Sequence, residues 1–192
     1  FGAGFLVFSL LLCPTALMAD IVHDGSGNWE VTGTENNTSP PITATGGSSV
    51  IVSDDALLNT EGNDGITVQT GGYTVEVGQN ATVAPDGHGV NITGGDSNTV
   101  TNEGSIEGGL KPGSYWGYGI GITGGGVGHT IENYGTISSV RGAIDIADSN
   151  NVVIANEGNI VTNHLDHPQD NGYFSIGLRG GNGTISNETT GI

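Results

Sequence analysis

Aromatic and polar side chains gather in two short stretches of the sequence, and their chemistry is that of ligand binding. The stretch 108–118 contains Lys111, Tyr115, Trp116 and Tyr118. The stretch 162–174 contains His164, Asp166, His167, Tyr173 and Phe174. Aromatic faces beside polar groups suit sugar rings or a protein partner. We therefore predict that these residues belong to binding loops. The alternative is that they are ordinary surface loops whose aromatic rings shield neighbouring backbone.

Two other kinds of chemistry fit the sequence less well. His164, Asp166, His167 and Asp170 lie close together, but their spacing matches no established zinc signature. Asp145 is flanked by glycine at the equivalent positions of the repeat described below, so it has no obvious partner carboxylate for acid–base catalysis. No plausible Ser-His-Asp set stands out either. We expect no catalytic residue, no metal site and no cofactor.

A repeat of about 24 residues must position the two stretches. The clearest copies have two apolar residues in alternation followed by Gly-Gly, as in Ile120-Gly121-Ile122-Thr123-Gly124-Gly125, and looser copies begin at Ala143 and Ser175. The first apolar residue of successive copies falls at Ile42, Ile66, Val90, Ile120, Ile144 and Ile176. The steps of 24, 24, 30, 24 and 32 residues place insertions of 6 and 8 residues in the two aromatic stretches. Both insertions therefore enter the same corner of the repeat.

A second motif, Asn-x-Gly-x-Ile, follows in the later copies. It begins at Asn102, Asn133 and Asn156, and a partial copy begins at Asn187. Val52 and Val77 hold the corresponding place in the earlier copies. Stacked amides bond to one another and to turn backbone. We predict that the four asparagines form a structural ladder.

The repeat predicts the fold. Each period holds three short stretches in which apolar residues alternate, which indicates strands with one inward face. Glycine and asparagine between them permit sharp corners. Three strands and three corners describe one coil of a parallel β-helix, with coils about 4.8 Å apart. We predict an all-β chain, a right-handed parallel β-helix of about six coils, because parallel crossovers have that hand. Stacked hairpins fit less well, since propeller blades need a period nearer about 40 to 50 residues.

The first residues have the features of an export signal. Residues 4–13 form an apolar run that is too short to span a membrane, and Ala19 offers a cleavage point. We expect a signal peptide at 1–19, truncated at its start, an N-terminal entry and capping segment at 20–41, and repeats at 42–192, truncated at the C-terminus. A buried apolar strand is the alternative for residues 1–19.

Charge excludes several classes of partner. The chain has 3 Lys and Arg against 20 Asp and Glu, a formal net charge of −17. Almost nothing could neutralise nucleic-acid phosphates or an anionic membrane surface, so we expect neither as a partner. The one cysteine, Cys13, falls in the expected signal peptide, so we expect no disulfide in the mature chain.

The Asn-Glu-Gly-Ser-Ile unit at Asn102, its copies and the Gly-Ile-x-Ile-Thr-Gly-Gly stretches resemble the passenger repeats of autotransporters over roughly residues 42–192. The resemblance implies a Gram-negative cell-surface protein exported through a C-terminal β-barrel translocator. It also implies a stalk or adhesin-like scaffold that binds a host or environmental glycan or protein. The alternative is a carbohydrate-active β-helix enzyme, a polysaccharide lyase or hydrolase.

Overall fold

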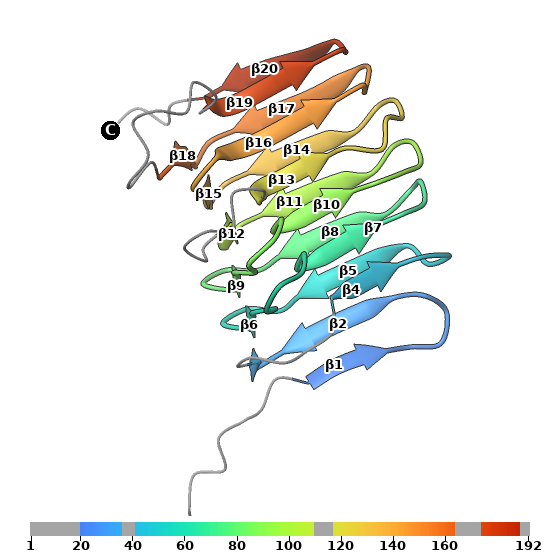
Figure 1. Cartoon of the computed structure of the whole chain (residues 1–192). Coiled ribbons are helices and arrows are strands. Elements are labelled where there is room, and N and C mark those ends of the chain that lie inside the picture. Colours follow the sequence, from blue (N-terminus) through green and yellow to red (C-terminus); the bar gives the residue numbers. More distant parts are fainter. Residues whose placement is uncertain (1–19, 36–40, 110–116, 164–173, 189–192) are drawn as a thin grey trace, which may run out of the picture.

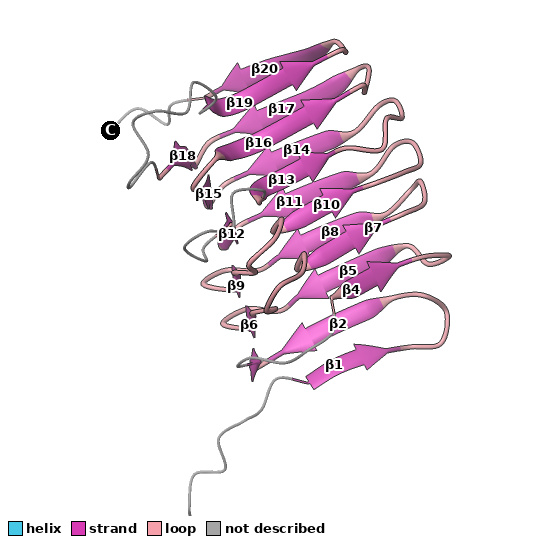
Figure 2. Cartoon of the chain, in the orientation of Figure 1, coloured by secondary structure: helices cyan, strands magenta, loops and turns pink. Residues whose placement is uncertain are grey.

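A computed structural model describes residues 20–35, 41–109, 117–163 and 174–188 of the chain. Every regular element in these ranges is a β-strand (Figure 2), so the all-β prediction is confirmed. Within the same ranges, no helix has the length and apolar character needed to cross a membrane. The expected signal peptide lies outside the described residues.

The strands form three sheets that run along the length of the stack (Figure 1). Sheet I contains β1 (Asp20–His23), β2 (Trp29–Thr32), β5 (Ser49–Val52), β8 (Thr74–Val77), β11 (Thr99–Asn102), β14 (Thr130–Asn133), β17 (Val152–Asn156) and β20 (Gly183–Asn187). Sheet II contains β4 (Ile42–Ala44), β7 (Ile66–Val68), β10 (Val90–Ile92), β13 (Tyr118–Ile122), β16 (Gly142–Ala147) and β19 (Phe174–Arg179). Sheet III contains β3 (Thr34–Glu35), β6 (Leu57–Leu58), β9 (Thr82–Val83), β12 (Ser105–Gly108), β15 (Thr136–Ser139) and β18 (Asn159–Thr162).

From β2 onward, consecutive strands pass from sheet I to sheet III to sheet II, and each passage through the three sheets is one coil. Each strand pairs in parallel with the strand three elements away, an arrangement compatible with the predicted β-helix. Among the described strands, only β1 is antiparallel to its neighbour, β2. Residues 20–35 therefore place β1 at the edge of sheet I and already add parallel strands to sheets I and III.

The repeat sets the register of sheet II. Its six strands pair through one continuous column, which runs Ile42, Ile66, Val90, Ile120, Ile144 and Ile176. Both insertions fall between a strand of sheet III and the next strand of sheet II, from β12 to β13 and from β18 to β19. Parallel pairing absorbs the longer connections without shifting the column, because the strands on either side keep their register.

The core lies between the three sheets and is made of the inward residues of each coil. Ile106, Ile120 and Ile137, for example, are completely buried. Each such side chain contributes about 1.5–3 kcal/mol by leaving water. In the last described strands the equivalent residues Leu178 and Ile185 are 42% and 46% exposed. The inward residues at this end of the described chain are therefore less covered than those further back in the stack.

The four predicted ladder asparagines are hydrogen-bonded in series inside the stack. Asn102 Nδ2 donates to Asn133 Oδ1 at 2.7 Å, and Asn133 Nδ2 donates to Asn156 Oδ1 at 2.7 Å. Asn156 Nδ2 donates to Asn187 Oδ1 at 2.6 Å. The ladder therefore has a direction, with every amide donating toward the C-terminal end. At its start, Asn102 Oδ1 is buried without a hydrogen-bond partner and faces the column of Val77 and Val52.

The glycine of the Asn-x-Gly-x-Ile motif is needed for a separate reason, which is the close approach of stacked backbone at this position. A Cβ on Gly135 would lie 2.0 Å from Gly104 O, and a Cβ on Gly158 would lie 2.1 Å from Gly135 O. Stacked corners between sheets I and III approach too closely for any side chain at this position. The motif thus combines an asparagine whose side chain is hydrogen-bonded inside the stack with a glycine that leaves the corner backbone without a side chain.

Candidate functional site

The two aromatic residues that the structure describes within the predicted binding loops are Tyr118 and Phe174. The other predicted binding residues lie outside the described residues: Lys111, Tyr115, Trp116, His164, Asp166, His167 and Tyr173. Tyr118 is the first residue of β13, and Phe174 is the first residue of β19. Each therefore lies where the chain returns from an insertion to sheet II.

Gly142 brings these two residues together. Tyr118 and Phe174 both pair with Gly142, the first residue of the intervening strand β16. Their rings stack with centroids 6.1 Å apart and planes 25° apart. A Cβ on Gly142 would lie 2.8 Å from Phe174 Cε2. Because Gly142 has no side chain, the rings of Tyr118 and Phe174 can meet although they lie two coils apart.

The short corner between β15 and β16 adds a cation to this stack. Ser139 Oγ accepts hydrogen bonds from the backbone N–H groups of Arg141 and Gly142, at 3.1 and 2.8 Å, and donates to Gly142 O at 2.7 Å. This turn places Arg141 over Tyr118, with its guanidinium carbon 5.5 Å from the ring centroid. Arginine over an aromatic face is attracted by the ring quadrupole. Ser139 thus holds the turn between β15 and β16, in the coil that lies between the two insertions.

A buried ion pair lies beside the rings. Asp145 occupies the outward position of β16 yet is completely buried. Arg179 Nε donates to Asp145 Oδ1 at 2.9 Å, and Arg179 Nη2 pairs with Asp145 Oδ2. Burial and then the negative charge of Asp145 hold the pKa of the Tyr118 phenol above its ordinary value. The hydrogen bond to Asp145 likewise raises the pKa of Arg179, so the phenol stays neutral and the guanidinium stays charged at neutral pH.

His88 extends the row of rings on the other side of Tyr118. Its ring centroid lies 5.3 Å from that of Tyr118, and a Cβ on Gly121 would lie 2.6 Å from His88 Cδ2. Asp64 holds the imidazole in place, with Oδ1 2.9 Å from His88 Nδ1. Asn91 Nδ2 donates to Asp64 Oδ2 at 2.7 Å. Partial burial acts to raise the pKa of Asp64, but the bonds from His88 and Asn91 outweigh it and hold the pKa below its ordinary value.

We call this group the aromatic corner; its members are His88, Tyr118, Arg141, Asp145, Phe174 and Arg179. The corner contains both arginines of a chain with three Lys and Arg residues in all. Tyr118 and Asp145 are buried, Phe174, Arg141 and His88 are partly exposed, and the Arg179 side chain is 58% exposed. A molecule that approaches the corner therefore meets a ring and a cation rather than the phenol or the carboxylate. This combination suits binding better than catalysis.

Sequence reasoning treated Asp145 as isolated because glycine flanks it at the equivalent positions 121 and 177. In the structure those glycines leave the space that the rings of His88 and Phe174 occupy. The cationic partner, Arg179, comes from two positions further along the neighbouring strand, where it pairs with Ala147. Opposite charges at outward positions two residues apart on adjacent coils were the signal that could have identified this pair.

The roots of both insertions are closed by backbone contacts. A Cβ on Gly117 would lie 2.4 Å from Gly109 N, so the chain leaves and returns at nearly the same point. Across the second insertion, Thr162 Oγ1 donates to Phe174 O at 2.8 Å. Each insertion is therefore anchored beside the aromatic corner at both ends.

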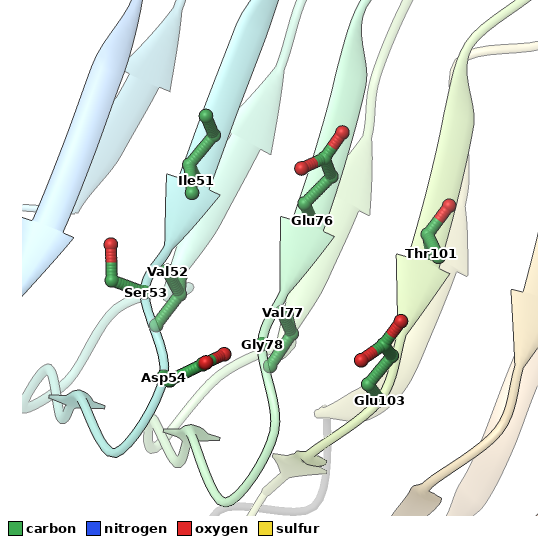
Figure 3. Close-up of a pocket in the computed structure, with 9 residues that line it drawn as sticks. All are labelled: Ile51, Val52, Ser53, Asp54, Glu76, Val77, Gly78, Thr101 and Glu103. Atoms are coloured by element: carbon green, nitrogen blue, oxygen red, sulfur yellow. The ribbon is translucent and has the colours of Figure 1, made fainter.

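A second surface feature lies on the outside of sheet I. A hollow of about 670 Å³ is lined there by three carboxylates, those of Asp54, Glu76 and Glu103 (Figure 3). All three side chains are exposed, and Asp54 Oδ1 accepts a hydrogen bond from Gln79 N at 2.9 Å. Within the described ranges, no group of three or more His, Cys, Asp or Glu residues is arranged to hold a metal ion.

No protein-family model matches the chain, and neither a curated protein nor a solved structure matches it significantly.

Proposed function

We propose that this chain is part of an exported autotransporter passenger, folded as a right-handed parallel β-helix that serves as a cell-surface stalk with a ligand-binding corner. The stacked parallel strands and the repeat motifs support the passenger assignment. In such a protein a C-terminal β-barrel translocator would carry the stalk to the bacterial surface. The partner would be a host or environmental glycan or protein.

The aromatic corner is the observation that carries the binding role. Two insertions two coils apart have their roots at one place, and Tyr118 and Phe174 join them through stacked rings. Both arginines of the sequence lie at the same place. Aromatic and arginine side chains dominate binding energy in protein interfaces. Stability of the core alone does not require either type at an outward corner.

A glycan array probed with the full chain tests this proposal. The Phe174→Ala variant should lose bound glycans, while Tyr134→Ala should bind as the parent does, because Tyr134 lies directly after β14 of sheet I, outside the aromatic corner, and is 49% exposed. Far-UV circular dichroism checks that both variants keep their strands. Glycan binding that survives in Phe174→Ala would contradict the assignment of the corner, as would the absence of any bound glycan.

The alternative function is a carbohydrate-active enzyme, and the hollow on sheet I is the observation that favours it. Glycoside hydrolysis uses two carboxyl groups, one of which is usually held protonated by a protected environment. The carboxyl groups of Asp54, Glu76 and Glu103 line one hollow but are all exposed. Release of reducing sugar that disappears in Glu76→Gln and Glu103→Gln would favour the enzyme over the stalk.

A further inference from the structure

We propose that the aromatic corner binds a glycan whose terminal sugar carries a single carboxylate. This inference rests on the proposed binding function and adds the chemical class of the ligand. It follows from three properties of the corner: an arginine held in one orientation, a ring beside it, and the charge of the rest of the chain.

Arg179 presents donors in a fixed direction. A guanidinium has five N–H donors in a planar fork, and Asp145 engages this one through Nε and Nη2. Among the described residues, Asp145 accounts for every hydrogen bond of the Arg179 side chain, so N–H groups remain for a ligand. The carboxylate of Asp145 is completely buried, whereas the Arg179 side chain is 58% exposed. A cation already held by a buried anion loses little entropy when it binds a second carboxylate.

The ring of Phe174 supplies the other half of the recognition. It fills the space above Gly177, where a Cβ would lie 2.4 Å from Phe174 Cε2, and the side chain of Arg179 starts two residues further along the same strand. An apolar ring face next to a charged fork matches a sugar that has C–H groups on one face and a carboxylate at its edge. A neutral sugar would use only the ring, and a simple carboxylate would use only the arginine.

The charge of the whole chain limits how many acidic groups the ligand can carry. The formal net charge is −17, so a polyanion is repelled before it reaches the corner. Charges beyond about 8 Å are largely screened at physiological salt, so one carboxylate placed at Arg179 feels mainly the guanidinium it contacts and the nearby carboxylates of Asp145 and Asp148. The field therefore favours a single acidic group over an oligomer of acidic sugars.

Titration calorimetry with four probes tests the proposal: a short oligosaccharide ending in one uronic acid, its methyl ester, an oligouronate of equal length, and a peptide with one free carboxylate. The parent chain should bind the acid at least about tenfold more tightly than the ester, since a charge-assisted hydrogen bond is worth that much. It should bind the oligouronate and the peptide more weakly than the acid.

The variant that tests Arg179 must not leave Asp145 buried with an unpaired charge. We therefore choose the double variant Arg179→Gln with Asp145→Asn, which removes one charge of each sign and leaves the net charge at −17. This variant should bind acid and ester equally. Glu132→Gln, on sheet I, should keep the parent's preference for the acid.

Equal binding of acid and ester by the parent, lost in Phe174→Ala, would overturn the acidic ligand while leaving the proposed binding function intact. Tighter binding of the oligouronate or of the peptide than of the single acid would also overturn the inference. Failure of all four probes to bind would count against the inference and, with a negative glycan array, against the binding function itself.

Discussion

The rings of Tyr118 and Phe174 stack although the strands that carry them are not neighbours, because Gly142 on the strand between them has no side chain. In parallel coils the usual contact is between adjacent strands. Here an empty position allows a contact that skips one strand and joins the roots of two insertions. The two insertions therefore share a corner of the repeat, and the space left by Gly142 also lets the rings at their roots contact each other.

Gly142→Ala should separate the two rings and lower the free energy of unfolding by about 0.5–1.5 kcal/mol, the value of an aromatic pair. Chemical denaturation measures this loss, and near-UV circular dichroism reports the environment of Tyr118. In a Phe174→Leu background the same substitution should cost less, because the ring that the new Cβ displaces is gone. An equal cost in both backgrounds would show that the glycine does not act through Phe174.

Position within the ladder should decide the cost of replacing an asparagine. Asn133→Val leaves Asn156 Oδ1 without its donor and keeps the unpartnered Asn102 Oδ1. Asn102→Val removes the unpartnered Asn102 Oδ1 but also removes the donor to Asn133 Oδ1. One side-chain oxygen of the ladder therefore lacks a partner before and after this change. Each buried unsatisfied group costs about 1–3 kcal/mol, so Asn133→Val should be the more destabilising change by that amount. Urea denaturation of the two variants compares them directly, and equal midpoints would contradict a directional ladder.

A hydroxyl placed just below the ladder should find a partner. Val77→Thr keeps the branched shape and can donate to Asn102 Oδ1, whereas Val52→Thr, one coil earlier, meets only valines. A buried hydroxyl without a partner costs about 1–3 kcal/mol, so Val52→Thr should show this loss and Val77→Thr should show less of it. Thermal unfolding of both variants gives the comparison. The prediction fails if Val77→Thr is as damaging as Val52→Thr.

Acid should remove the stabilising effect of Asp64. Because the pKa of Asp64 is lowered in the fold, its contribution is present above its ordinary pKa of about 3.9 and is lost as pH falls through the folded value. Asp64→Asn should therefore be less stable than the parent at pH 6, and this gap should close as pH is lowered toward 2. Asn91→Ala, which removes one of the donors, should show a smaller gap that closes over the same range. A gap that stays constant with pH would exclude this ionisation as its source.

The register of sheet II could be predicted from the sequence because alternating apolar residues mark the inward face in every copy, even across the two insertions. The positions of the ladder asparagines could be predicted for the same reason. The direction of the ladder could not be, because both ends of an amide fit the same position and only the packed stack decides which end donates.

The aromatic corner was predicted only through Tyr118 and Phe174. Arg179 and Asp145 are 34 residues apart because the second insertion lies between their coils, so their opposite charges do not line up in the sequence. The ring of His88 can lie where it does because Gly121 has no side chain. No sequence motif indicates that the ring of His88 would occupy this space. Such contacts arise only when the outward positions of several coils are seen together.

The one-way ladder also makes the coils unequal as building blocks for protein engineering. A cassette spanning 134–156 begins after one ladder amide and ends on another, so duplicating or excising it rejoins a donor to an acceptor. A cassette that ends on Val77 offers no donor, and splicing it into the later half would create a second unpartnered oxygen. Libraries of longer or shorter stalks should therefore be cut at the asparagines, where the joints are chemically interchangeable.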